Sequence, residues 1–273
     1  MHNDSLVTDN QEIRKLIFDH FSSHFNSSFN DLHITMSGCI FKSLSSASRK
    51  FLEYNVTKEE VWSTVLDCGS SKASGPNGFN MGFIKNKWDL LKDDILNFVY
   101  DFWETSTMAR CVKASFIALI LKVQSLTVIS DFRPICLVGS LYKIVSKLLA
   151  NRLKLVMPEI IGDSQSAFIG GRQILDSVLI ANETVDWARK KKQKLYVLQL
   201  DFAKAYDCVQ WSFLDYLMVR IGFGVKWKSW IKGCIQVVPL SILINGSPTC
   251  QFNINRGLRQ GCPLSPFLFN IVA

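Results

Sequence analysis

The chain has 273 residues, 48% of them hydrophobic, so it is long enough to bury a sizeable core in one large or two smaller domains. A net charge of +8 favours polyanionic partners such as RNA or DNA over acidic ones. The first residues include acids where a secretory signal would be basic, and the longest apolar runs fall far short of the roughly 20 residues that span a bilayer. We therefore expect an intracellular protein, of the nucleus or cytoplasm, that is neither secreted nor inserted in a membrane.

The cysteines and histidines give little support to a metal site. Eight cysteines are scattered without a Cys-x-x-Cys pair, and no histidine follows His33, which argues against zinc and for reduced thiols. His20 and His24 have the i,i+4 spacing that can bind a metal on a helix, but the only further ligand nearby is Asp19. A helix face flanked by two phenylalanines is the simpler interpretation.

The N-terminal part is predicted to be a connector that carries one helix. Apolar residues recur at helical spacing and predict an amphipathic helix over about 12–25. A stretch rich in Ser and Asn follows over 26–48, and order resumes with the capping-box pattern Thr-Lys-Glu-Glu at 57–60. We place the first segment at 1–56 and the main domain at 57–273.

The first half of the main domain alternates helices with short extended segments. A loop rich in Gly and Pro at 70–78 separates two helical patterns, and the apolar run at 116–123 is consistent with a strand. Residues 131–135 are expected to be extended because of their proline. The longest clean helix pattern covers about 140–156 and is expected to end at Pro158. Its basic face suits an RNA-facing element, although a solvated face is the commoner explanation.

The next predicted helix, over 174–189, runs into the cationic stretch 190–194. This stretch is either a nuclear-import or phosphate-contact patch, or simply a favourable end for the helix dipole. A strand at 195–200, a turn and a helix over about 208–221 are predicted to follow.

The last regular feature is a hairpin over 240–254. Asn245-Gly246 supplies the positive φ angles that tight hairpin turns require. Helices with few strands favour an α+β fold, helix-rich with a small mixed or antiparallel sheet of non-consecutive strands.

The candidate chemistry centres on Asp201, at the end of the predicted strand. A carboxylate there is held rigidly and suits phosphoryl transfer assisted by two Mg²⁺ ions about 3.5–4 Å apart. One Asp cannot hold two ions. Asp207 is the nearest second candidate, but it precedes a predicted helix and is better placed as an N-cap. Lys204, between them, is better suited to contact phosphate or solvent.

Seven further segments form an ordered series of motifs, at 74–78, 119–122, 130–135, 141–154, 165–173, 200–207 and 259–266. The last two read Leu-Asp-Phe-Ala-Lys-Ala-Tyr-Asp and Arg-Gln-Gly-Cys-Pro-Leu-Ser-Pro. In sequence and order, these segments resemble the reverse transcriptase of plant LINE-type non-LTR retrotransposons. The resemblance implies a partial right-hand polymerase, mainly fingers over 57–194 and the first part of the palm over 195–273, which works on an RNA template, a DNA primer and dNTPs.

The resemblance also implies roles for single residues. Asp201 is implied to be the first metal-binding aspartate, with the Phe202 carbonyl as a second oxygen ligand for Mg²⁺. Tyr206 sits where the family places an aromatic steric gate against the nucleotide 2′-hydroxyl; an ordinary buried tyrosine is the alternative. Lys122 and Arg133 match the residues that grip the incoming triphosphate, a task suited to a point charge and a bidentate guanidinium, and an ordinary surface ion pair is the alternative.

Four further residues are implied to touch nucleotide or template. Gln260 and Gly261 match the pair that contacts the incoming nucleotide, since glycine allows close backbone approach, and a simple turn is the alternative. Gln165 and Arg172 resemble the motif that touches template and fingers, although Gly-Gly-Arg at 170–172 could serve only as a bend.

The sequence also departs from the family pattern. Asn77 stands where the family's loop has Asp. The family's Ala-Asp-Asp hairpin would follow Ala273, so these residues alone are expected to be inactive, with the apolar segment 264–273 left without its sheet partner. The leading interpretation is a fragment of an RNA-directed DNA polymerase.

Two other interpretations remain open at this point. A non-catalytic RNA-binding remnant would show affinity that falls with salt and does not depend on Mg²⁺ or on Asp201. An unrelated Asp-dependent phosphatase or phosphotransferase would need a second nearby carboxylate or a phosphate loop, and the chain has no Gly-x-x-x-x-Gly-Lys-Ser/Thr.

Overall fold

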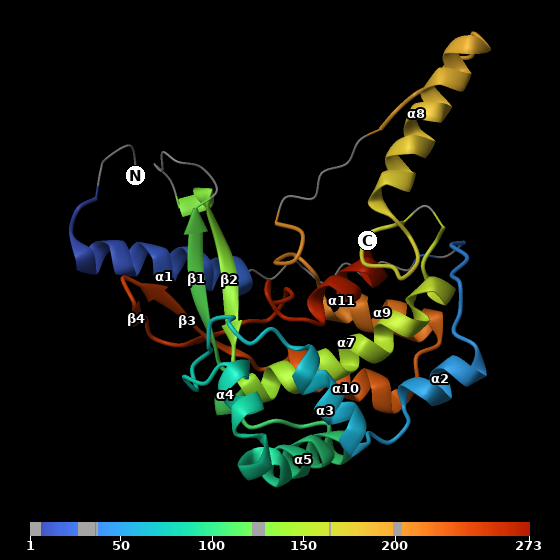
Figure 1. The fold of residues 1–273 in the computed structure, drawn as a ribbon. Helices are drawn as coiled ribbons and strands as arrows, with labels where there is room; N and C mark the ends of the chain where they lie inside the picture. The colour runs from blue at the N-terminus through green and yellow to red at the C-terminus, as the bar shows by residue number, and fades with distance from the viewer. Residues whose placement is uncertain (1–6, 27–35, 37, 122–128, 164, 199–203) are drawn as a thin grey trace.

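A small mixed sheet lies beside a larger group of helices in the part of the chain that the computed structural model describes (Figure 1). The described residues are 7–26, 36, 38–121, 129–163, 165–198 and 204–273. The helices are α1 (Asn10–Asn26), α2 (Ser46–Leu52), α3 (Lys58–Asp67), α4 (Met81–Asn86), α5 (Trp88–Thr105), α6 (Arg110–Lys113), η1 (Ile129–Asp131), α7 (Ser140–Ile160), α8 (Ile174–Lys190), α9 (Trp211–Ile221), α10 (Val225–Ile235) and α11 (Ser265–Val272). The strands are β1 (Ser115–Leu121), β2 (Phe132–Val138), β3 (Pro239–Ile244), β4 (Ser247–Pro248) and β5 (Phe252–Asn253). The expected helix-rich class with a small mixed sheet is confirmed.

The sheet joins strands that lie far apart in the sequence. Its order is β2-β1-β3-β4, with β5 also paired to β3. β1 and β2 are antiparallel, whereas β1 and β3 are parallel, with Ser115 opposite Leu240. Pro134 is tolerated because β2 is the outer strand of the described sheet, where one backbone N–H can be missing. The predicted non-consecutive pairing is therefore correct.

Several elements form where local sequence predicts them. α1 covers the predicted helix, and Thr57 caps α3 by accepting a hydrogen bond from the Glu60 amide at 3.2 Å. In the predicted hairpin, Asn245 and Gly246 have φ angles of 50° and 77°, which join β3 to β4 by a tight turn.

α7 is the central helix of the core. It contacts α2, α3, α6 and α11, and Figure 1 shows it running across the middle of the helical layer. Its buried apolar side chains recur at helical spacing and include Ile144, Val145, Leu148, Leu149 and Leu153. The expectation that Pro158 ends this helix is wrong. α7 continues to Ile160, because its last residues are buried and the Ile161 amide bonds to the Met157 carbonyl.

The loop before α4 packs against the junction of β2 and α7. A Cβ at Gly75 would overlap the backbone of Val138 and Gly139, so only glycine fits there. Asn77, the departure from the family pattern, donates a hydrogen bond from its amide to the Ser140 hydroxyl at 2.6 Å. This loop thereby fixes the start of α7.

The predicted start of the helix after 207 and the predicted strand at 195–200 were wrong. α9 begins at Trp211 rather than near 208, so Asp207 is not its N-cap; Gln210 occupies that position. Residues 195–198 of the predicted strand are irregular and exposed, with Tyr196 90% exposed. An apolar run forms a strand only if a neighbouring strand pairs with it, and 195–198 pair with none of the described strands. Residues 199 and 200 lie outside the described residues.

α8 and α11 differ sharply in burial. Figure 1 shows α8 standing away from the other helices, and of its side chains that the structure describes only Ala188 is buried. The segment 264–273, expected to have an uncovered apolar side, instead forms α11, whose Leu268 and Ile271 are buried. α11 packs on α9 and α7.

None of the helices in the described part is long and apolar enough to cross a membrane.

A buried arginine ties α7 to α3. Arg152, 4% exposed, donates from Nε and Nη2 to both carboxylate oxygens of Glu60 at 2.7 Å each. Its Nη1 donates to the Leu52 carbonyl at 3.0 Å, and its guanidinium lies 5.1 Å from the Trp103 ring centroid. Such a bidentate pair fixes both partners in one geometry.

We expect Arg152→Ala to lower the free energy of unfolding by about 3 kcal/mol, because it leaves Glu60 and the Leu52 and Asn55 carbonyls without this donor. Urea denaturation measures the change. Arg189→Ala, at an exposed residue of α8, is the matched control and should shift the midpoint little. Equal shifts for the two variants would contradict the structural role of Arg152.

Candidate nucleic-acid interface

The loop 256–263, between β5 and α11, is held in place by a second buried arginine. Arg259 is 6% exposed and donates to the Lys113 carbonyl at 2.9 Å, the Ser115 hydroxyl at 2.9 Å and the Cys234 carbonyl at 3.0 Å. Its guanidinium lies 3.8 Å from the centroid of the Tyr142 ring. One side chain thus connects the loop to the segment before β1, to β1, to α10 and to α7.

The two ends of this loop press against other backbone segments through glycines. Gly257 and Gly261 have φ angles of 88° and 104°, which favour glycine. A Cβ at Gly261 would lie 2.8 Å from the Cys136 carbonyl oxygen of β2. The Cys136 amide donates to the Gln260 carbonyl at 2.7 Å, so Gln260 and Gly261 are fixed directly beside β2. Burial raises the pKa of the Cys136 thiol to about 12, which keeps it neutral at this contact.

Tyr206 belongs to the turn that supports the other side of the loop. Its carbonyl accepts a hydrogen bond from the Leu258 amide at 2.8 Å, and its ring lies 5.2 Å from that of Phe269 on α11. Burial raises the pKa of Tyr206, so its hydroxyl remains neutral. The turn at Tyr206 is therefore bonded to the loop that carries Gln260 and Gly261.

Asp207 is buried beside a histidine of α1. It is 7% exposed, and its Oδ2 lies 3.6 Å from Nε2 of His24 on α1. His24, which is partly buried, therefore has a carboxylate as its neighbour. Among the described residues, no group of three His, Cys, Asp or Glu side chains is arranged to hold a metal ion.

The remaining predicted residues are only partly described. Arg133 is exposed on β2, opposite Ile120 of β1. Lys122, Asp201 and Phe202 lie outside the described residues, so the triphosphate grip and the Mg²⁺ ligands implied for them stay predictions.

Gln165 and Arg172 shape the loop between α7 and α8. The Arg172 guanidinium donates to the Gln165, Gly162 and Ile161 carbonyls, and the Gln165 amide donates to Asn270 of α11 at 3.4 Å. Both side chains thus fold their own segment against the core.

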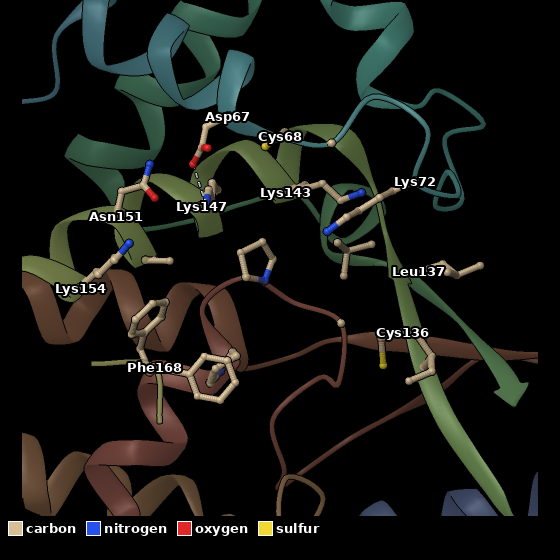
Figure 2. Close-up of a pocket in the computed structure, with 18 of the residues that line it drawn as sticks. Asp67, Cys68, Lys72, Cys136, Leu137, Lys143, Lys147, Asn151, Lys154 and Phe168 are labelled. Carbon is tan, nitrogen blue, oxygen red and sulfur yellow. Dashed lines mark ion pairs between the residues drawn. The ribbon is translucent and has the colours of Figure 1, made fainter. Parts of the chain in front are cut away.

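A cavity of about 710 Å³ opens between α7, β2 and this loop (Figure 2). Gly261 is one of its lining residues, together with Pro263 and Phe267. Figure 2 shows lysines of α7 on one side and Phe168 on the other. The cavity is therefore cationic on one wall and apolar on the opposite wall.

Four lysines and one carboxylate set the charge of the cavity. The lysines that line it are Lys72, Lys143, Lys147 and Lys154. Lys147 Nζ lies 2.7 Å from Asp67 Oδ2, and this hydrogen bond lowers the pKa of Asp67. Burial lowers the pKa of Lys143. A net excess of cations suits a polyanion such as a nucleic-acid backbone.

Sequence reasoning did not assign this cavity. The basic face of the helix pattern at 140–156 was a partial signal, because Lys143, Lys147 and Lys154 belong to it. Lys72 and Phe168 join it only through tertiary packing.

The comparisons with known proteins agree with the resemblance to reverse transcriptases. Residues 120–273, more than half of the chain, match the family model described as reverse transcriptase (RNA-dependent DNA polymerase). The chain is 29% identical over 228 residues to the transposon TX1 uncharacterized 149 kDa protein of Xenopus laevis, covering 84% of this chain and 17% of that protein. It is 33% identical over 145 residues to the retrovirus-related Pol polyprotein from type-1 retrotransposable element R2 of Popillia japonica, covering 52% of this chain and 20% of that polyprotein.

A third relative, the retrovirus-related Pol polyprotein from type-2 retrotransposable element R2DM of Drosophila melanogaster, is 24% identical over 236 residues, which cover 84% of this chain and 22% of that polyprotein. The chain therefore spans about a fifth of the length of these relatives.

We expect Gly261→Ala to lower the free energy of unfolding by about 1–3 kcal/mol, because alanine is strained at this φ and its Cβ would collide with the Cys136 carbonyl. Thermal or urea denaturation measures the loss. Gly170→Ala is the control, since a Cβ there meets nothing within 4 Å. If Gly261→Ala were as stable as Gly170→Ala, the close approach to β2 would not constrain the loop.

Proposed function

This chain belongs to the reverse transcriptase (RNA-dependent DNA polymerase) family, and we propose that it forms the fingers and the first part of the palm of an RNA-directed DNA polymerase from a non-LTR retrotransposon. The observation that carries the proposal is the position of Gln260 and Gly261. Their loop is fixed by Arg259 beside Tyr206 and β2, at the edge of a cationic cavity. The finer assignment to LINE-type elements of plants is part of the proposal and depends on the order of the seven sequence segments.

Each residue has a role in this proposal. Gln260 and Gly261 contact the incoming nucleotide, and the exposed Arg133 holds its triphosphate together with Lys122. Tyr206 carries the steric gate against a 2′-hydroxyl, since its ring is supported by Phe269. Template RNA, DNA primer and dNTPs are the proposed partners.

The metal site depends on Asp201 and the Phe202 carbonyl, which are hard oxygen ligands of the kind that Mg²⁺ prefers. Mg²⁺ bound there would activate the primer 3′-hydroxyl and stabilise the leaving pyrophosphate. Asp207 does not supply a second carboxylate, because it is buried against His24. We therefore propose that these 273 residues alone hold primed RNA and nucleotide without extending the primer.

A non-catalytic RNA-binding remnant is the second candidate function. The cationic cavity favours it independently, because the cavity requires neither Asp201 nor a metal to attract a polyanion. The two candidates differ in their response to nucleotide.

We expect the complementary dNTP, with Mg²⁺, to tighten binding of a primed RNA whose primer ends in a dideoxynucleotide, whereas a mismatched dNTP does not. Fluorescence anisotropy of the labelled primer measures affinity over a range of salt. Asp201→Asn should remove the effect of the dNTP and leave the metal-free affinity unchanged. Equal affinities with both dNTPs would favour the non-catalytic RNA-binding remnant.

A parallel primer-extension assay on the longest chain encoded at the locus, with Asp201→Ala as control, tests for synthesis itself.

We expect Tyr206→Ala to reduce the preference of this complex for a dNTP over the matching rNTP, because the smaller side chain leaves room for the 2′-hydroxyl. The same anisotropy assay, with the two nucleotides compared side by side, measures the preference. Tyr216→Ala, at a partly buried tyrosine of α9 that stacks on Phe213, is the matched control. An unchanged preference would assign Tyr206 to packing alone.

A further inference from the structure

Phe168 occupies a position that neither packing nor backbone preference explains. Its φ angle is 61°, in the left-handed region that large side chains rarely adopt. Its side chain is 59% exposed, so it gains only part of the free energy that burial of a phenylalanine provides. Strained residues of this kind persist where the surroundings hold them, and they cluster at ligand-contact sites.

The turn that carries Phe168 is held on both sides. The buried Asn270 of α11 donates to the Ala167 carbonyl at 2.7 Å, and the Ser166 hydroxyl lies 2.9 Å from that of Ser177 in α8. Arg172 bonds to the Gln165 carbonyl at 2.6 Å. The ring is therefore presented to the cavity from a fixed backbone.

Across the cavity lie cations without a partner acid. Lys147 is paired with Asp67, but in the described part of the chain no ion pair involves Lys72, Lys143 or Lys154. The volume of about 710 Å³ lies within the range of about 300–1,000 Å³ that is typical of small-ligand pockets. A cavity of this size admits one or two nucleotides of a strand.

We propose that this cavity binds single-stranded nucleic acid, with one unpaired base stacked on Phe168 and its phosphates against Lys72, Lys143 and Lys154. Aromatic side chains stack on the face of any unpaired base, and lysines track the backbone, which is the usual combination in single-strand binding. In a duplex, neighbouring base pairs already cover the faces of each base. The Phe168 ring therefore has no free base face on which to stack. The inference deepens the proposed function by naming how one strand is held, but its chemistry requires neither metal nor nucleotide.

The test measures binding of a labelled single-stranded RNA and of a duplex of the same sequence to the full 273-residue chain, in EDTA and without dNTP. Phe168→Ala should weaken single-strand binding about tenfold and change duplex binding little, because the stacking contact is lost. Phe168→Trp should retain binding, whereas Phe168→Leu, apolar without a ring, should not. Phe51→Ala, at an exposed phenylalanine of α2 outside the cavity, is the matched control.

Lysine variants test the opposite wall. Lys154→Ala should reduce the slope of log affinity against log salt by about 1, and Lys58→Ala, on the exposed face of α3, should not. Urea denaturation of every variant shows whether it is folded before its affinity is compared.

Three results would overturn the inference. They are an unchanged affinity of Phe168→Ala for the single strand, an equal loss for the duplex, and full binding by Phe168→Leu. Failure of the proposed function is separate, since it would appear as loss of the dNTP effect while the dependence on Phe168 persists. Conversely, a dNTP effect without dependence on Phe168 would leave the polymerase proposal intact and remove this one.

Discussion

The rest of the candidate site depends on the burial of one guanidinium, that of Arg259. A charge removed from water is destabilising unless every donor finds an acceptor, so the positions around it must fit together. The acceptors come from the segment before β1, from β1 and from α10, while the Tyr142 ring of α7 covers one face. The loop that carries Gln260 and Gly261 cannot move without exposing or orphaning this charge. The geometry at the surface is thus set by the core.

Local sequence predicted the elements whose formation depends on local chemistry. α1 and α7 follow from helical periodicity, the Thr57 cap from its capping box, and the β3–β4 turn from Asn245-Gly246. The boundaries that were wrong depend instead on contacts between segments that are distant in the sequence. The apolar run 195–198 has no partner among the described strands, and Asp207 lies beside His24 of α1 rather than at the start of α9. Neither a strand partner nor a histidine from a distant helix can be recognised from nearby residues.

The candidate site was likewise predicted only in part. Motif resemblance assigned roles to Tyr206, Gln260 and Gly261, and in the structure the Tyr206 carbonyl bonds to the loop that carries the other two. It gave no indication of the cavity, whose lysines come from α7 and from the loop after α3 and whose aromatic wall includes Phe168. A positive φ angle at a phenylalanine has no local sequence signature, because it is imposed by contacts from α11 and Arg172. Such positions emerge only once the chain is folded.

The path of α7 has a consequence for energetics. Near its start, Tyr142 covers the guanidinium of Arg259; further along, Arg152 binds Glu60; and the lysines between and beyond them line the cavity. A shift of this helix along its axis would break the contacts of two buried cations at once. The backbone of α7, which carries three of the four lysines, is therefore fixed before any ligand arrives. In the proposed complex, the entropic cost of association would fall mainly on the strand that must become ordered and on the lysine side chains, rather than on the protein backbone.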